Sequence, residues 1–289
     1  MSIYFTDTDC ELWYTDADEL DIKIIEMPYT LDGEEIFYDM GRNTDFKHLF
    51  RRMREGSVPI TSALNPQIYM DYFEPWLEKG EDIIYVHFSD KLSGTFKYLE
   101  TALNILREKY PARTVTLFNT KSICWGAGSQ ALEGAKLHKA GATDEEIVAF
   151  LKDFTKHTVC TFVVDSLAHL KRGGRISATT AVVGGLLNIK PILRIDDEGF
   201  IQKYGTAKGM KRALLNMADE CGVNYIKGQH YPVYICDADN EEMGDFLEKA
   251  LRARIGEDAD IKRYPIGPVI GAHCGPGTVG LIYQGEKRI

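Results

Sequence analysis

Short apolar runs typical of strands alternate with segments of helical spacing through the first half of this chain. Residues 3–5, 83–88 and 115–118 are predicted strands, and residues 95–108 and 128–139 are predicted helices. This strand-loop-helix order favours a parallel sheet, because parallel neighbours need a crossover connection. We therefore predict an α/β fold whose N-terminal domain is a parallel sheet with helices on both faces.

The second half of the chain has a different pattern. Residues 191–195 and 201–203 are predicted strands, and Asp196-Asp197-Glu198-Gly199 between them is typical of a β-hairpin turn. We predict two domains, residues 1–157 and residues 158–289, the second being an α/β domain with antiparallel pairing. The last strand of the chain belongs to the second domain or returns to the first.

Composition narrows the class of protein. The net charge of -9 over 289 residues argues against nucleic acid as the main partner, because phosphate backbones require a basic face. Asp7 and Asp9 occupy positions that are apolar in a signal peptide, and the apolar stretch at residues 181–189 is shorter than the roughly 20 residues of a membrane span. Six scattered cysteines indicate reduced thiols. We expect a cytoplasmic protein without an integral membrane segment.

Three polar segments follow predicted strands, and the carboxyl ends of parallel strands are where ligands bind in such sheets. They are Thr6-Asp7-Thr8-Asp9, Thr61-Ser62 and Ser93-Gly94-Thr95. The first is either a network of turns that supports a neighbouring site or part of a cation site. The second and third either cap helices or hold a ligand.

Ser93 precedes a predicted helix, where free backbone N–H groups and the helix dipole favour an anion, and Gly94 allows close approach to the backbone. A nucleophilic role is the alternative. However, Lys91-Leu92-Ser93-Gly94-Thr95 departs from the Gly-x-Ser-x-Gly pattern of a nucleophile elbow, and a base such as His273 would be required.

Two glycine-rich segments complete the candidates. Lys171-Arg172-Gly173-Gly174-Arg175 is either a solvated turn or a site for phosphate or an acidic partner. Residues 267–277 place four glycines and two prolines around His273, which predicts a rigid, open backbone that presents this side chain.

Together these segments closely resemble the DegV family, in that family's order and over nearly the whole chain. The matching stretches are Thr6-Asp7-Thr8-Asp9-Cys10-Glu11-Leu12, Thr61-Ser62, Leu92-Ser93-Gly94-Thr95, Leu170-Lys171-Arg172-Gly173-Gly174-Arg175-Ile176-Ser177 and residues 266–277. The resemblance implies two α/β domains with an acyl chain buried between or within them. It also implies a bacterial fatty-acid-binding protein, in some members the binding subunit of a two-component fatty acid kinase.

The resemblance assigns roles to the hydroxyl-rich segments. Thr61 and Ser93 match the hydroxyls that bind the fatty acid carboxylate, and Ser62, Gly94 and Thr95 belong to the same motifs. The family often has a proline two residues after its Thr-Ser pair, whereas three residues intervene here. Which of Thr61 and Ser62 contacts the carboxylate is therefore left open.

The resemblance also assigns basic residues. His273 and Arg172 match positions near the carboxylate end that are associated with phosphoryl transfer or kinase docking, with Arg175 as the nearby alternative. The implied partners are a long-chain fatty acid and an ATP-dependent fatty acid kinase subunit. The chain has no phosphate-loop motif, so we do not expect it to bind ATP, and no cofactor or metal is expected.

Two other functions stay open. One is a serine hydrolase that acts on acyl esters, and the other is a carrier of a different amphipathic lipid. Apolar residues 162–164 and 181–187 either line the predicted tunnel or pack in the core.

Overall fold

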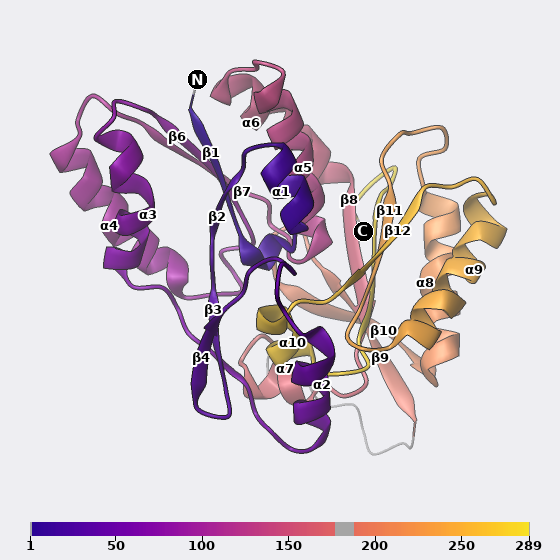
Figure 1. Ribbon diagram of the computed structural model, residues 1–289. Coiled ribbons are helices and arrows are strands. Elements are labelled where there is room, and N and C mark those ends of the chain that lie inside the picture. The colour runs from indigo at the N-terminus through magenta and orange to yellow at the C-terminus, as the bar shows by residue number, and fades with distance from the viewer. Residues whose placement is uncertain (1, 177–187, 289) are drawn as a thin grey trace. The chain divides into compact units, whose positions relative to one another are not determined.

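The computed structural model describes residues 2–176 and 188–288 (Figure 1). The predicted tunnel residues 181–187 lie outside the described residues. The chain divides into two compact units, the first made of Met1–Thr44 and Ile60–Thr155 and the second of Asp45–Pro59 and Lys156–Ile289.

The first unit is built on a four-stranded sheet whose strands are all parallel, in the order β2-β1-β6-β7. The strands are β1 (Ile3–Asp7), β2 (Lys23–Ile25), β6 (Ile83–His87) and β7 (Val115–Asn119). All five residues of β6 are buried, which is typical of a central parallel strand covered on both faces. Helices α3 and α4 lie on one face and α5 and α6 on the other (Figure 1). The predicted parallel sheet with helices on both faces is confirmed.

Local capping signals set where several of its helices begin. The helices are α1 (Tyr14–Glu19), α3 (Pro66–Leu77), α4 (Thr95–Lys109), α5 (Trp125–Lys139) and α6 (Asp144–His157), with a 3-10 turn, η1, at Thr8–Cys10. The Asn65 side chain accepts a hydrogen bond from Ile68 N at 3.1 Å. Thr143 and Glu146 bond each other's backbone N–H, at 3.3 and 2.8 Å, as a capping box does.

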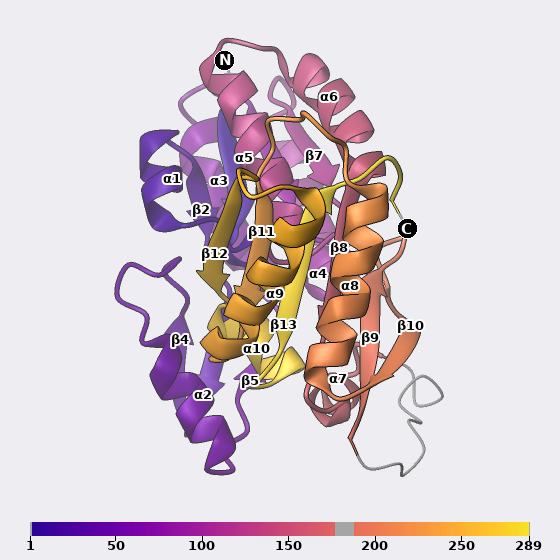
Figure 2. The same ribbon diagram turned by 90° about the vertical axis from the view of Figure 1, so that its right-hand side faces the viewer.

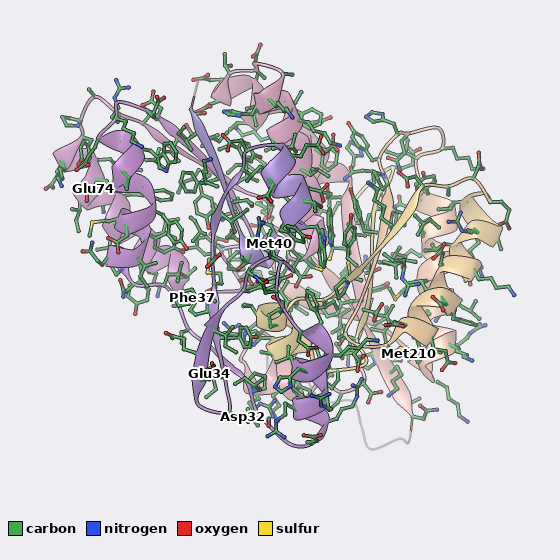
Figure 3. The ribbon with its side chains drawn as sticks, in the orientation of Figure 1. Asp32, Glu34, Phe37, Met40, Glu74 and Met210 are labelled. Carbon is green, nitrogen blue, oxygen red and sulfur yellow. The ribbon has the colours of Figure 1, made fainter. Side chains whose placement is uncertain are left out.

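A small antiparallel sheet was not predicted. It has the order β4-β3-β5 and consists of β3 (Pro28–Leu31), β4 (Glu34–Phe37) and β5 (Ile60–Thr61). Asp32 (φ 52°) and Gly33 (φ 90°) form its two-residue turn, whose positive φ angles match the type I′ hairpin that Asp-Gly favours. Figure 3 labels Asp32 and Glu34 at this turn. Strand β5 includes Thr61, whereas the segment Thr61-Ser62 was predicted to follow a strand.

The second unit contains a six-stranded mixed sheet in the order β10-β9-β8-β13-β11-β12. Its strands are β8 (Thr158–Val163), β9 (Ile189–Ile195), β10 (Ile201–Lys208), β11 (Val233–Asp237), β12 (Ile261–Pro265) and β13 (Val279–Gln284). Neighbours are antiparallel except β11 and β12. The predicted antiparallel pairing and the hairpin at Asp196 are confirmed. The last strand, β13, pairs with β8 and β11, so it stays in the second unit.

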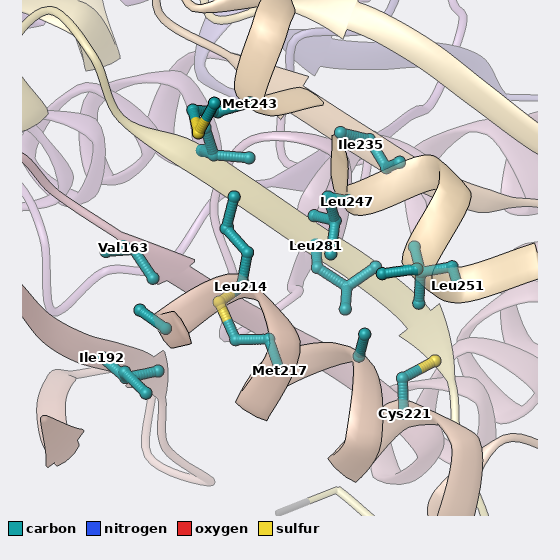
Figure 4. Packing of buried hydrophobic residues seen from close by; sticks show 14 of the residues in the cluster. Val163, Ile192, Leu214, Met217, Cys221, Ile235, Met243, Leu247, Leu251 and Leu281 are labelled. Carbon is teal, nitrogen blue, oxygen red and sulfur yellow. The ribbon is translucent and has the colours of Figure 1, made fainter. Parts of the chain in front are cut away.

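Two long helices, α8 (Met210–Asn224) and α9 (Glu241–Ile255), cover one face of this sheet (Figure 2). Their apolar side chains interdigitate with those of the strands, as Leu214, Leu247 and Leu281 do in Figure 4. All three are fully buried. This core holds the second unit together through loss of apolar surface to water.

Helix α2 (Phe46–Arg54) lies within residues 1–157, the range predicted as the first domain. Its contacts belong to the second unit: Phe50 packs so closely on Gly271 that a Cβ there would lie 2.8 Å from the ring. The Arg54 guanidinium also pairs with the Asp239 carboxylate. The chain therefore enters the second unit once before residue 60 and returns to it at residue 156.

Candidate functional site

A buried carboxylate organises the carboxyl edge of the first sheet. Asp7 ends β1, and its Oδ2 accepts hydrogen bonds from the Tyr85 hydroxyl at 2.9 Å and from Phe88 N at 3.2 Å. Its Oδ1 accepts from Asp9 N at 3.0 Å. Burial raises the pKa of Asp7 to about 7, against the lowering effect of these hydrogen bonds. Asp7 thus fixes the backbone that leads from β6 toward Ser93.

Threonines beside Asp7 extend this support. Thr6 Oγ1 donates to Val86 O at 2.8 Å, and Thr8 Oγ1 accepts from Met27 N at 2.9 Å, next to β3. Strand β3 in turn pairs with β5, where Tyr29 lies opposite Thr61. Of the two interpretations of Thr6-Asp7-Thr8-Asp9, these bonds match the turn network. No cluster of three or more metal-ligating side chains occurs in the described parts of the chain.

The Ser93 turn lies at the start of a long helix. Helix α4 begins at Thr95, and Ser93 Oγ accepts a hydrogen bond from Thr95 N at 3.2 Å. Gly94 is exposed, and a Cβ placed on it would meet no atom within 4 Å. The N–H groups of the first helical turn and the positive end of the helix dipole make this turn suited to a carboxylate.

The structure brings the two hydroxyl-rich segments together. Leu64 N, just after Thr61-Ser62, donates to Thr95 Oγ1 at 3.2 Å. Thr61 is half-buried and Ser62 is exposed, whereas Thr95 is buried.

Tyr69 was missed by the sequence analysis. Its hydroxyl lies 2.8 Å from Thr95 Oγ1 and is buried with it. Its position on the apolar face of α3 gave no signal that distinguishes it from a core aromatic residue.

A buried histidine lies at the end of β6. His87 Nδ1 donates to Phe88 O at 2.7 Å, and its ring packs on Phe96 with centroids 4.5 Å apart. Burial lowers the pKa of His87 to about 4, so the imidazole is neutral at physiological pH. Within the described part of the first unit, no histidine hydrogen-bonds the Ser93 hydroxyl. A nucleophilic serine would need such a base.

In the second unit, the prediction that residues 171–175 form a basic loop is wrong in part. Lys171 and Arg172 are the last residues of helix α7 (Ala168–Arg172). Arg175 N bonds Leu170 O and Gly174 N bonds Lys171 O, both at 3.0 Å, with Gly174 at φ 73°. This is a Schellman motif, which needs a residue that tolerates positive φ after the helix.

The prediction of an open backbone around His273 is also wrong, because Pro268–Cys274 form helix α10. Pro268 occupies the first turn and Gly275 (φ 81°) follows the last, which is the usual placement of these two residue types. His273 lies in the last turn of α10.

Helices α7 and α10 pack through a reciprocal pair of histidines and glycines. A Cβ on Gly173 would lie 2.3 Å from His273 Nδ1, and one on Gly275 would lie 2.4 Å from the His169 ring. His169 Nδ1 accepts from Arg172 Nη2 at 2.8 Å. These close approaches require glycine at both positions.

The charges around His273 follow from this packing. Burial, followed by the positive charges of Arg175 and Arg172, lowers the pKa of His273 to about 4. The structure therefore gathers these three predicted residues in the second unit, with the imidazole neutral. Such a group can donate one hydrogen bond and accept another, beside two positive charges that disfavour its protonation.

Fold and site define a two-unit α/β protein with a hydroxyl-rich turn suited to a carboxylate and a separate cluster of one histidine and two arginines. Among the described residues, no helix has both the length and the apolar character that crossing a membrane requires. All six cysteines are buried, and no disulfide joins any of them within the described residues.

Comparison with known proteins identifies the family. The sequence model described as "Uncharacterised protein, DegV family" matches residues 4–286. A DegV domain-containing protein of Clostridium perfringens is 32% identical over 287 residues, which cover 99% of this chain and 98% of that one. The chain therefore belongs to the DegV family.

Solved structures agree with this assignment. A DegV lipid-binding protein from Thermotoga maritima matches with a TM-score of 0.84 and 25% identity, covering 100% of both chains. A DegV family protein from Thermus thermophilus, described by its fatty acid binding, has a TM-score of 0.83 and 28% identity, covering 98% of this chain and 100% of that one. DegV of Bacillus subtilis, described as a fatty acid binding protein, has a TM-score of 0.81 and 26% identity over 99% and 100% of the two chains.

Proposed function

We propose that this protein binds a long-chain fatty acid and holds its carboxylate at the hydroxyls of Thr61 and Ser93. The observation that carries the proposal is the junction of their two segments at the start of α4, where Leu64 N meets Thr95 Oγ1 at 3.2 Å. Gly94 leaves the backbone open there. Relatives with the same fold are described as fatty acid binding proteins, which supports the proposal.

The tail and the head group of a fatty acid contribute differently to binding. Each buried methylene contributes about 0.8 kcal/mol, so roughly a dozen contribute on the order of 10 kcal/mol before the costs of association. The tail then supplies most of the affinity. Hydroxyl and N–H donors orient the carboxylate without a bidentate arginine, which leaves a carboxylate oxygen accessible to another enzyme.

The basic cluster of the second unit suggests the next step. In our proposal Arg172 and Arg175 dock an ATP-dependent fatty acid kinase subunit, and His273 serves the phosphoryl transfer by which that subunit forms an acyl phosphate. The protein itself performs no chemistry and needs no cofactor. The neutral state of His273 supports this role, because a neutral imidazole keeps one N–H donor, which can bond an anionic oxygen of the ligand or its partner. A cytoplasmic location stays a prediction.

The head-group assignment is tested by titrating the protein with palmitic acid in competition with fluorescent cis-parinaric acid. Ser93→Ala removes a hydrogen bond to a charged group, and we expect affinity to fall about tenfold or more. Thr101→Ala is the matched control on α4, because its exposed hydroxyl bonds Lys97 O of the same helix, at 3.0 Å. Equal affinities for the two variants would remove Ser93 from the carboxylate site.

The kinase step is tested separately. The protein, palmitic acid, ATP and a bacterial fatty acid kinase subunit are combined, and acyl phosphate is trapped with hydroxylamine. Arg172→Ala should lower the yield while leaving palmitic acid affinity unchanged, and Arg212→Ala, an exposed arginine of α8, should change neither. Undiminished yield with Arg172→Ala would contradict its docking role.

A further inference from the structure

The buried hydroxyl of Thr95 connects the two halves of the proposed carboxylate site. Thr95 is 1% exposed, and its Oγ1 takes a hydrogen bond from Leu64 N at 3.2 Å. Leu64 lies three residues after Thr61 and is itself fully buried. At the same residue, Thr95 N donates to Ser93 Oγ at 3.2 Å. Thr95 therefore contacts the chain beside both hydroxyls proposed to bind the ligand.

This connection depends on the side-chain rotamer of Thr95. A threonine in a helix divides between two χ1 rotamers, because its hydroxyl can also bond a carbonyl of the preceding turn. Thr95 is the first residue of α4, where the preceding residues form the Ser93 turn. In the rotamer that faces Leu64, the hydroxyl also lies 2.8 Å from the Tyr69 hydroxyl. Tyr69 thus supplies the second hydrogen bond that favours this rotamer.

Tyr69 is well suited to hold Thr95. It lies on the first turn of α3, one turn after the Leu64 loop, and its side chain is fully buried. Its ring packs against Phe73 with centroids 6.3 Å apart. Burial raises the pKa of Tyr69, so its hydroxyl keeps its proton. The hydroxyl is therefore a fixed, protonated partner.

We propose that Tyr69 is a positioning residue for the ligand carboxylate. It selects the Thr95 rotamer that bonds Leu64 N, and through that bond it sets the spacing between the Thr61 and Ser93 hydroxyls. This inference rests on the proposed function, because it assigns that spacing to carboxylate binding. The tail of the ligand is not involved.

The test compares two ligands with the same tail and different head groups. Palmitic acid at pH 8 carries an ionised carboxylate, whereas 1-hexadecanol carries a neutral hydroxyl. Both are measured by competition with cis-parinaric acid. Tyr69→Phe keeps the ring and removes only the hydroxyl. We expect palmitic acid affinity to fall about fivefold, the effect of one hydrogen bond, and hexadecanol affinity to stay unchanged.

A matched control lies three residues further along the same helix. The Tyr72 hydroxyl accepts from Glu26 N at 3.1 Å, whereas the Tyr69 hydroxyl bonds Thr95. Tyr72→Phe should leave both affinities at the wild-type values. Thr95→Val completes a double-mutant cycle: if Tyr69 acts through Thr95, Tyr69→Phe has no further effect once the Thr95 hydroxyl is gone.

Each outcome decides between distinct explanations. Equal losses for the acid and the alcohol would mean that Tyr69 merely stabilises the fold, and this would overturn the proposal. Unchanged acid affinity, or losses that add in the double variant, would overturn it as well. A wild-type protein that binds neither ligand would instead refute the proposed function.

Discussion

Asp7→Asn tests how the carboxyl edge of the first sheet is built. In the folded protein Asp7 is fully buried, and burial raises its pKa from 3.8 to about 7. The substitution replaces an ionisable group by a neutral one of similar shape. Because the unfolded chain ionises this aspartate readily and the folded chain does not, its contribution to stability is full at low pH. It is lost as the pH rises through about 7.

The size of the effect follows from the two pKa values. The pKa of Asp7 differs by about three units between the unfolded and the folded chain. At 1.36 kcal/mol per pKa unit, this difference corresponds to about 4 kcal/mol of unfolding free energy between pH 4 and pH 7. Over the practical range from pH 5 to pH 7, the same linkage predicts about 2 kcal/mol. The wild-type protein should therefore lose about 2 kcal/mol relative to Asp7→Asn across this range.

The three tryptophans provide a probe for the right part of the molecule. Trp13, Trp76 and Trp125 all belong to the first unit, so their fluorescence in urea reports the unfolding of that unit. Titrations at pH 5, 6 and 7 give the difference between the two proteins at each pH. A difference that does not change with pH would refute the assignment of a raised pKa to Asp7.

Three glycine substitutions test close packing and open space. In Gly128→Ala the new Cβ would lie 2.3 Å from Cys10 O, a backbone atom that cannot move independently, so we expect a loss of about 2 kcal/mol or more in the urea assay. In Gly271→Ala the new Cβ would lie 2.8 Å from the ring of Phe50 on α2, which would push this helix away from α10. Trypsin should therefore cleave α2 faster, and unchanged cleavage would contradict the packing of α2 on α10. Gly94→Ala meets no atom within 4 Å at φ -75°, so stability should rise by about 0.5 kcal/mol while palmitic acid affinity falls; unchanged affinity would show that the ligand does not approach this backbone.

Elements with strong local signals could be predicted from the sequence. The Asn65 cap and the Thr143–Glu146 capping box depend on side chains within four residues of the backbone that they bond. The parallel sheet also followed, because buried strands alternate with amphipathic helices. The Asp32-Gly33 turn carried an equally local signal, but its sheet was overlooked because β4 is short and its first two residues are charged.

Features that depend on distant contacts could not be predicted. The apolar face of α2 was evident, but its partner Gly271 lies more than 200 residues later in the chain. The same holds for the candidate site. Ser93 and His273 stood out through their motifs, whereas Tyr69 acquires its significance only from the fold, which places its hydroxyl on Thr95.

The identity of the ligand tests the central claim most directly. Native mass spectrometry of the purified protein should show a population heavier than the bare chain by the mass of a long-chain fatty acid. Organic extraction should release that acid and return the mass to that of the chain, and added palmitic acid should restore the heavier species. A protein that carries no acyl chain and takes up no added palmitic acid would contradict the proposal.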